Sequence, residues 1–115
     1  MSALPVLNLY HVYAQDKPGA QRAKHKAQHL AQNTPHMQSG FIRVGGGLLP
    51  TDVKSTDPGA EEKIVGSFIV VKAESIDVVW DTLKKDIFYT SGEVWDLDKV
   101  CVTPVFVPFK EAKLA

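Results

Sequence analysis

The chain has 115 residues, with 13 Lys and Arg against 13 Asp and Glu, so its formal net charge is zero when the four histidines are neutral. Nucleic-acid binders usually carry a strong basic excess, so we expect no nucleic-acid partner. No apolar run reaches the ~20 residues that span a bilayer, and we expect no membrane partner either. The single cysteine, Cys101, excludes an internal disulfide and a multi-cysteine zinc site. The length predicts one domain over 1–115, and the lack of a visible secretory signal predicts a cytoplasmic protein.

The charge balance differs between the two parts of the chain. Residues 1–43 hold five basic residues and one acid, Asp16, whereas the remainder holds eight lysines and twelve acids. All four histidines lie in the basic part. The difference is explained either by solvated faces that differ by chance or by two parts that pack side by side or across a dimer interface.

The first elements predicted from the pattern are a strand and a helix. Residues 6–14 are apolar and aromatic with partial alternation, which predicts a strand, and residues 16–19 form a turn. Residues 19–33 are rich in Ala, Gln and Lys and predict a helix that Pro35 ends. The small apolar residues of this helix form one narrow stripe, which we expect to face the sheet: Ala20, Ala23, Ala27, Leu30 and Ala31.

Two further strands follow, separated by a long loop. Residues 41–44 predict a short strand that Gly45-Gly46-Gly47 interrupts, and residues 49–62 predict an exposed loop. The glycines suit either anion binding or, as we favour, a bend that admits a neighbouring group. Residues 64–73 predict a central strand, in which Gly66 marks a bulge or a close backbone approach.

The last elements are the second helix and the closing strand. Ser75 is a good N-cap for a helix whose apolar residues Ile76, Val79, Trp80 and Leu83 follow the helical period. Residues 86–98 predict a loop. Residues 100–109 predict a strand that its two prolines either restrict to a sheet edge or interrupt with a bulge.

The order β-α-β-β-α-β predicts an α+β, ferredoxin-like sandwich with a four-stranded antiparallel sheet and both helices on one face. The first strand has apolar residues on both faces: Leu7, Leu9 and Tyr13 on one, and Val6, Tyr10 and Val12 on the other. A sheet without a polar face needs a second cover, and a second copy of the same sheet supplies it most simply. We therefore expect a homodimer, and Cys101 is expected to be a buried thiol.

Several short motifs occur together in a particular order along residues 7–109. They are Tyr13-Ala14-Gln15-Asp16, Pro18-Gly19-Ala20, Arg22, Gln28-His29-Leu30, Gly45-Gly46-Gly47, Gly66-Ser67, Lys72-Ala73-Glu74-Ser75, Asp86 and Gly92-Glu93-Val94-Trp95. In this combination the chain resembles the YCII-related family, small proteins of the dimeric α+β barrel type. The resemblance implies a general acid–base pair formed by His29 and Asp86. The family usually has Asp-Pro-aromatic after the second helix, whereas here Asp86 is followed by Ile87 and Phe88.

The residues alone leave two interpretations of each member of this pair. His29 suits proton transfer near neutral pH, but it lies about 150° from the apolar stripe of its helix, which favours a solvated face. A catalytic His29 therefore requires that another element cover this face. Asp86 ends the second helix beside apolar Ile87 and Phe88, so we expect its pKa to be raised, although an ordinary helix-ending aspartate fits as well.

Other side chains complete the candidate site. Arg22 is expected to orient an anionic or phenolic oxygen, and Tyr13 and Trp95 to pack on a substrate ring. His11 fits a core or interface position better than a ligand, but we retain it as a residue that lines the barrel and contacts substrate. His25 and His29 are four residues apart, yet a third ligand is missing, so we predict no metal.

Two functions fit these observations. The first is an acid–base enzyme without a cofactor, a lyase or isomerase acting on a small ring or lactone-like metabolite, as some relatives in the resembled family do. The second is a module that binds the same kind of small molecule without turnover, or that serves as an accessory protein.

Overall fold

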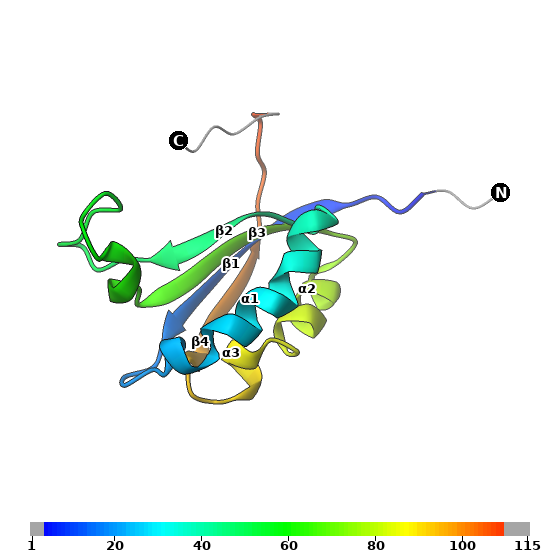
Figure 1. Ribbon diagram of the computed structural model, residues 1–115. Helices are drawn as coiled ribbons and strands as arrows, with labels where there is room; N and C mark the ends of the chain where they lie inside the picture. The colour runs from blue at the N-terminus through cyan, green and yellow to red at the C-terminus, as the bar shows by residue number, and fades with distance from the viewer. Residues whose placement is uncertain (1–3, 110–115) are drawn as a thin grey trace.

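The computed structural model describes residues 4–109, so residues 1–3 and 110–115 of the predicted 1–115 domain lie outside the described part. The described residues form four strands, three α-helices and one short 3-10 helix (Figure 1). In chain order these are β1 (Asn8–Asp16), α1 (Arg22–Gln38), β2 (Ile42–Leu48), η1 (Ala60–Lys63), β3 (Gly66–Ala73), α2 (Ile76–Leu83), α3 (Ile87–Thr90) and β4 (Trp95–Pro104).

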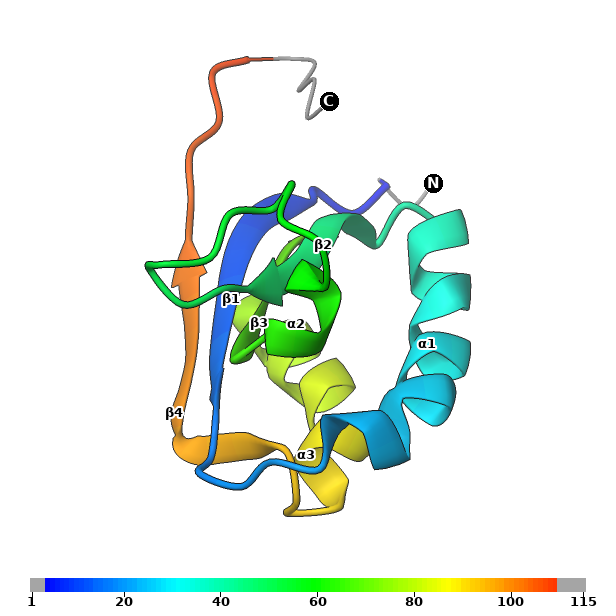
Figure 2. The same ribbon diagram turned by 60° about the vertical axis from the view of Figure 1, so that its left-hand side comes forward.

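The four strands form one antiparallel sheet in the order β2-β3-β1-β4. The helices α1, α2 and α3 all lie over the same face (Figures 1 and 2). The predicted α+β, ferredoxin-like fold is therefore confirmed. β4 is an edge strand, which is one of the two alternatives that its prolines left open. No helix in the described part of the chain is long and apolar enough to cross a membrane.

The residues of β1 alternate between the two faces of the sheet. Tyr10, Val12 and Ala14 are buried toward the helices, whereas His11 and Tyr13 point to the opposite face. Tyr13 lies opposite Phe68 of β3 and Cys101 of β4 on that open face, so Cys101 is exposed rather than buried as predicted. The prediction of a buried thiol assumed a cover that one described chain does not provide.

Helix α1 differs from its prediction at both ends. It begins at Arg22, because Gly19 adopts a left-handed turn conformation, and it continues past Pro35 to Gln38. A proline so close to the end disrupts only the last turn. The hydroxyl of Thr34 donates to the Leu30 carbonyl, and the Ser39 N–H donates to the Pro35 carbonyl, so the turn remains hydrogen-bonded.

The three glycines do not interrupt β2. Gly45 pairs with Ile69 and Gly47 with Ser67, inside a continuous ladder. A Cβ at Gly45 would lie 2.8 Å from the Ile69 side chain, and one at Gly47 would lie 2.6 Å from the Ile64 side chain. The glycines therefore admit neighbouring side chains across β2, in agreement with the packing interpretation.

Short helices interrupt both predicted loops. η1 lies at the end of the predicted 49–62 loop, and α3 lies within 86–98. The closing strand begins five residues earlier than predicted, because Trp95 pairs with Asp16 beyond a bulge in β4, where four residues of β4 face one residue of β1. Trp95 is therefore a buried strand residue and not a loop residue.

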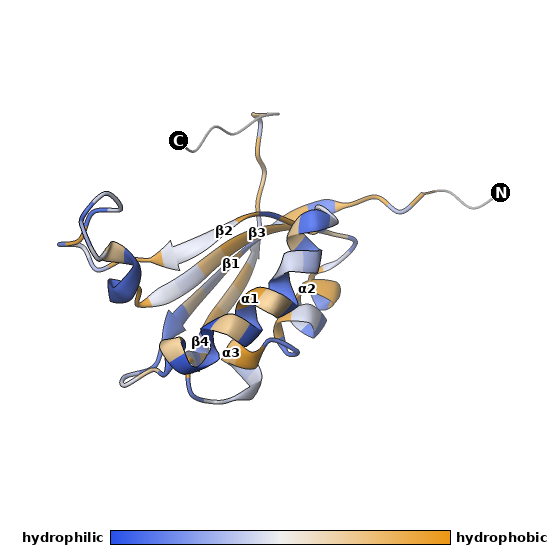
Figure 3. Cartoon of the chain, viewed as in Figure 1, coloured by the Kyte–Doolittle hydropathy of each residue, from blue (hydrophilic) through white to orange (hydrophobic). Residues whose placement is uncertain are grey.

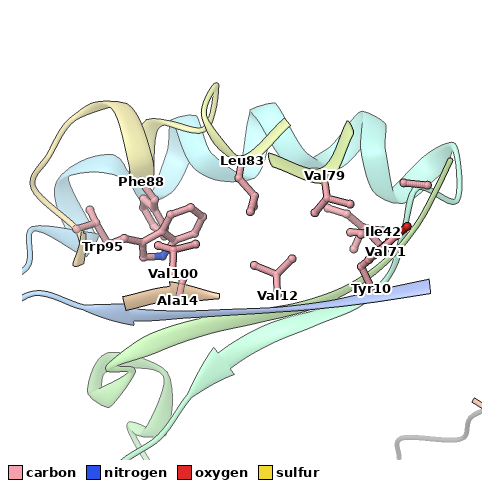
Figure 4. Close-up of a cluster of buried hydrophobic side chains, with 12 residues drawn as sticks. Tyr10, Val12, Ala14, Ile42, Val71, Val79, Leu83, Phe88, Trp95 and Val100 are labelled. Atoms are coloured by element: carbon pink, nitrogen blue, oxygen red, sulfur yellow. The ribbon is translucent and has the colours of Figure 1, made fainter. Parts of the chain in front are cut away.

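The hydrophobic core lies between the sheet and α2 with α3 (Figure 4). Val12 and Val71 from the sheet meet Val79 and Leu83 of α2, at the spacing that predicted this helix, and Phe88 of α3 packs beside them. Ser75 caps α2 as predicted, since its side chain accepts a hydrogen bond from the Val78 N–H. α1, which lies wholly within the described range, contributes no buried side chain to this core.

The close approach predicted at Gly66 gives a first test of the fold. A Cβ there would lie 2.8 Å from the Ala14 carbonyl oxygen and 2.7 Å from the Leu48 side chain. Because the strand backbone cannot yield, we expect Gly66→Ala to lower the free energy of unfolding by about 1–3 kcal/mol, measured by urea denaturation. Ser55→Ala, in the exposed 49–62 loop, is the control and should change it by less than about 0.5 kcal/mol. Equal stability of the two variants would contradict the close approach.

Candidate active site

Helix α1 contacts the rest of the molecule through its polar side, whereas Ala20, Ala23 and Leu30 of the predicted stripe face a cavity between the helix and the sheet and do not pack on the sheet. The stripe residues Ala23, Ala27, Leu30 and Ala31 are exposed, whereas the half-buried side chains all carry polar or charged groups. The half-buried residues are Arg22, His25, His29, Gln32, Asn33 and His36. Figure 3 shows hydrophilic and hydrophobic residues alternating along α1.

Ion pairs explain this orientation, and they join the basic first part of the chain to the acidic second part. His25 and Lys24 both contact Glu93, at 3.0 Å each, and Lys26 contacts Glu61 at 2.7 Å. Of the two explanations for the uneven charge, packing of the two parts side by side is therefore the one that the fold supports.

A second histidine contact forms the predicted pair. His29 Nδ1 lies 2.8 Å from Asp86 Oδ1, although the residues are 57 positions apart in the chain. His29 is covered by α3, since its ring stacks on Phe88 with centroids 3.8 Å apart and an interplanar angle of 3°. The condition for a functional His29, a covered helix face, is thus met.

Asn33 completes the pair, although the sequence interpretation missed it. Its side-chain amide donates to Asp86 Oδ2 and to the His29 carbonyl oxygen, both at 2.8 Å. A usable signal was present, because Asn33 follows His29 by four residues and so lies on the same side of the helix.

Asp86 occupies the beginning of α3 and not merely the end of α2. Its Oδ1 accepts the Phe88 N–H at 2.9 Å, which makes Asp86 the N-cap of α3. Burial acts to raise the pKa of this carboxyl, but hydrogen bonds from His29, Asn33 and Phe88 together outweigh burial and hold the pKa below its ordinary value. The predicted upward shift is therefore wrong, because the N-terminus of a helix stabilises the ionised form that its C-terminus would disfavour.

An ionised Asp86 determines which imidazole nitrogen is available. Since Asp86 Oδ1 accepts from Nδ1, the neutral ring carries its proton on Nδ1, and Nε2 is the unprotonated nitrogen. Nε2 has no hydrogen-bond partner among residues 4–109, and His29 lines the large cavity of the molecule. This is the arrangement of a general base oriented by a carboxylate.

Arg22 also lies against Phe88, with its guanidinium carbon 4.9 Å from the ring centroid. Its Nε donates to Asp16, and its Nη2 donates to Ser67 Oγ. Trp95 Nε1 donates to the same hydroxyl at 3.2 Å, so a buried indole holds Ser67 beside Arg22. With two of its five N–H groups occupied, Arg22 retains donors for a substrate oxygen.

Asp16 and Ser67 were not assigned to the site from the sequence. Asp16 Oδ1 is buried and has no hydrogen-bond partner among the described residues, which leaves a strong acceptor unsatisfied beside Arg22. The one usable signal was that Asp16 is the single acid among residues 1–43.

These groups surround one cavity of about 1320 Å³ between α1 and the sheet. The structure brings His29, Asp86, Arg22 and Trp95 together there. It does not bring the side chains of His11 and Tyr13 to them, because these two alternate onto the open face of the sheet.

His25 and His29 do not converge on one point, because each contacts a different carboxylate, Glu93 and Asp86. Within the described residues, no three His, Cys, Asp or Glu side chains are grouped so as to hold a metal ion.

The fold and site define a small α+β protein with a His–Asp pair beside a cavity. The YCII-related domain model matches residues 8–99, and the chain belongs to the YCII-related family. None of the curated proteins compared with the chain matches it.

Two solved structures resemble this chain. 5-chloro-2-hydroxyhydroquinone dehydrochlorinase (TftG) from Burkholderia phenoliruptrix AC1100, in complex with 2,5-dihydroxybenzoquinone, is 31% identical, with a TM-score of 0.68 over 82% of this chain and 89% of that chain. The "Putative antibiotic biosynthesis monooxygenase" from Bacteroides thetaiotaomicron VPI-5482 is 8% identical, with a TM-score of 0.51 over 96% of this chain and 97% of that chain. The second likeness shows the fold alone.

The lowered pKa of Asp86 predicts a pH dependence of stability. A carboxyl whose folded-state pKa lies below its unfolded value near 3.8 stabilises the fold fully above that value and loses this contribution as the pH falls through the folded pKa. We expect Asp86→Asn to unfold more easily than the wild type by about 1–3 kcal/mol at pH 7, and the difference to shrink below about pH 4. Urea denaturation at pH 7, 5 and 3 measures it. A difference that stays constant with pH would show that Asp86 is not stabilised as the ion.

Proposed function

We propose that this chain is an acid–base enzyme of lyase or isomerase type that needs no cofactor and acts on a small hydroxylated ring. The single observation that carries the proposal is the His29–Asp86 hydrogen bond, which leaves Nε2 unprotonated at the side of a cavity. A buried, ionised Asp86 keeps this tautomer and stabilises the imidazolium that forms when Nε2 takes a proton.

The remaining groups supply binding and charge stabilisation. Arg22 donates to the oxygen on which negative charge develops, and the buried Trp95 forms an aromatic side of the site. In an elimination, Nε2 removes a proton from the substrate, its bonding electrons form a new double bond, and the leaving group departs with its own electron pair. In an isomerisation, the proton returns to a different atom. Neither step needs an oxidant or a metal.

The likeness to TftG supports the elimination. That protein is a dehydrochlorinase of a hydroxylated, chlorinated ring, and its structure holds a dihydroxybenzoquinone. A ring that bears hydroxyl groups would satisfy the free donors of Arg22.

We include a homodimer in the proposal. The open face of the sheet carries Tyr13, Phe68, Val70 and Cys101, and within the described chain no helix covers it. A second sheet packed on this face would bury them, and His11 and Tyr13 would then line the space between the two sheets. A cytoplasmic location is also included, because the free thiol of Cys101 fits a reducing compartment.

Two substitutions test the catalytic pair. We expect His29→Ala to reduce turnover of chlorinated hydroquinones by about 10²–10⁴-fold, because the general base is removed. Asp86→Asn should reduce it by at least about 10²-fold, because the imidazole loses the partner that fixes its tautomer. Steady-state turnover and calorimetric binding of the same compounds are measured in parallel.

His36→Gln is the matched control, a half-buried histidine on the same helix that packs on Phe41 and not on Asp86. It should keep wild-type turnover. Loss of rate with retained affinity supports the enzyme. Binding without turnover, unchanged in all three variants, would favour the non-catalytic module instead.

The dimer is tested by mass. We expect light scattering to give twice the 12.6 kDa chain mass for the wild type. Val70→Asp should give the single-chain mass, because Val70 lies opposite His11 and Val44 on the open face, where a buried carboxylate is costly. Val78→Asp, at an exposed position of α2, serves as the control and should remain dimeric. A wild type whose mass by light scattering is that of a single chain at micromolar concentration would remove the dimer from the proposal.

A further inference from the structure

The cavity between α1 and the sheet has two chemically different ends. Its polar end is formed by Asp16, Arg22, Ser67, His29 and Asp86. Its apolar end is formed by Leu30 and Met37 of α1 and by Phe41, Ile42, Ile69 and Val71 of the sheet side. Every residue that we assign to catalysis or to oxygen binding lies at the polar end, and the apolar end has no role in the proposed function.

Two elements run from one end to the other and give its length. Ser67 and Val71 are four residues apart on β3, which corresponds to about 13 Å at the rise of a strand. His29 and Met37 are eight residues apart on α1, which corresponds to about 12 Å at the rise of a helix. The apolar end therefore extends well beyond the reach of a single ring bound at His29.

The volume leads to the same conclusion. An apolar cavity of roughly 150 Å³ accommodates benzene, and most ligand pockets measure about 300–1,000 Å³, whereas this cavity measures about 1320 Å³. A ring at the polar end leaves the apolar end unfilled. There Leu30 is 51% exposed and Met37 is 61% exposed, so apolar surface remains in contact with water.

We propose that the natural ligand is amphipathic: a hydroxylated ring at the polar end that carries an apolar alkyl or aryl substituent along the apolar end. The ring rests on the proposed function, whereas the substituent rests on the apolar end alone. Each methylene of such a substituent that becomes buried should raise the affinity about fourfold.

The experiment measures affinity against chain length. The full-length protein is titrated by calorimetry with hydroquinone and with its methyl, butyl and hexyl derivatives. We expect affinity to rise at least tenfold between the methyl and hexyl compounds. In the double variant Leu30→Gln, Met37→Gln the rise should fall below about threefold, because both apolar side chains at the rim of the cavity become polar.

Val78→Gln is the matched control, since Val78 is an exposed apolar residue of α2 that does not line the cavity. It should keep the full dependence on chain length. Leu30 and Met37 are exposed, so the double variant is expected to fold, and circular dichroism verifies this.

Three outcomes would overturn the inference: no gain from methyl to hexyl, a loss of affinity with chain length, or an equal gain in the double variant. A loss would mean that another segment, such as part of a second copy, fills the apolar end. An equal gain would mean nonspecific binding. His29→Ala separates the two proposals, because it removes turnover and leaves the chain-length dependence intact if both hold. A chain-length dependence in a protein without turnover would retain the apolar end and reject the enzyme.

Discussion

The hydrogen bond between His29 and Asp86 determines how α1 lies on the molecule. α1 has no buried apolar residue, so it lacks the usual reason for a helix to pack on a sheet. Polar contacts along one side of the helix hold it in place instead of apolar burial, from Arg22–Asp16 through His25–Glu93 to His29–Asp86. Among them, the contact to Asp86 is the one that also caps α3 and thereby positions Phe88.

This way of holding a helix has a geometric consequence. Apolar side chains that interdigitate with a sheet leave no space, whereas ion pairs and hydrogen bonds fix a helix at a distance that side-chain length sets. The core accordingly lies under α2, where Val79 and Leu83 fill the space, and the cavity lies under α1. The contact that orients the imidazole therefore also contributes to the space that a substrate would occupy.

The sequence predicted the features that depend on local patterns. Three such features are confirmed by the structure: the helical spacing of Val79 and Leu83, the alternation in β1 and the close approach at Gly66. Each of them depends on residues that are close together in the sequence. The orientation of α1 could not be predicted in this way. A helical wheel assumes that a helix packs through its apolar side, whereas α1 packs through its polar side, and the partners Asp86 and Glu93 lie more than 50 positions away.

The prediction of a raised pKa for Asp86 failed for a related reason. A position between two helices can act as the end of one or the beginning of the next, and these alternatives have opposite electrostatic effects. The pattern revealed α2 clearly, whereas α3 has four residues, too few to show a period. The family resemblance pointed to two residues that the structure brings into contact, but it did not indicate this reversal of the pKa shift.

The departure from the family motif at Ile87 is explained by the same junction. A proline suits the first position of a helix because the N–H that it lacks would otherwise have no partner within the helix. Here Ile87 keeps that N–H and donates it to Gln32 Oε1 of α1 at 2.8 Å, while the Gln32 amide donates to the Lys85 carbonyl at 3.0 Å. One α1 side chain thus binds the backbone on both sides of Asp86. The junction lacks the rigidity of a proline, but it gains a second direct connection to the helix that carries His29. This connection holds His29 and Asp86 together without the usual motif.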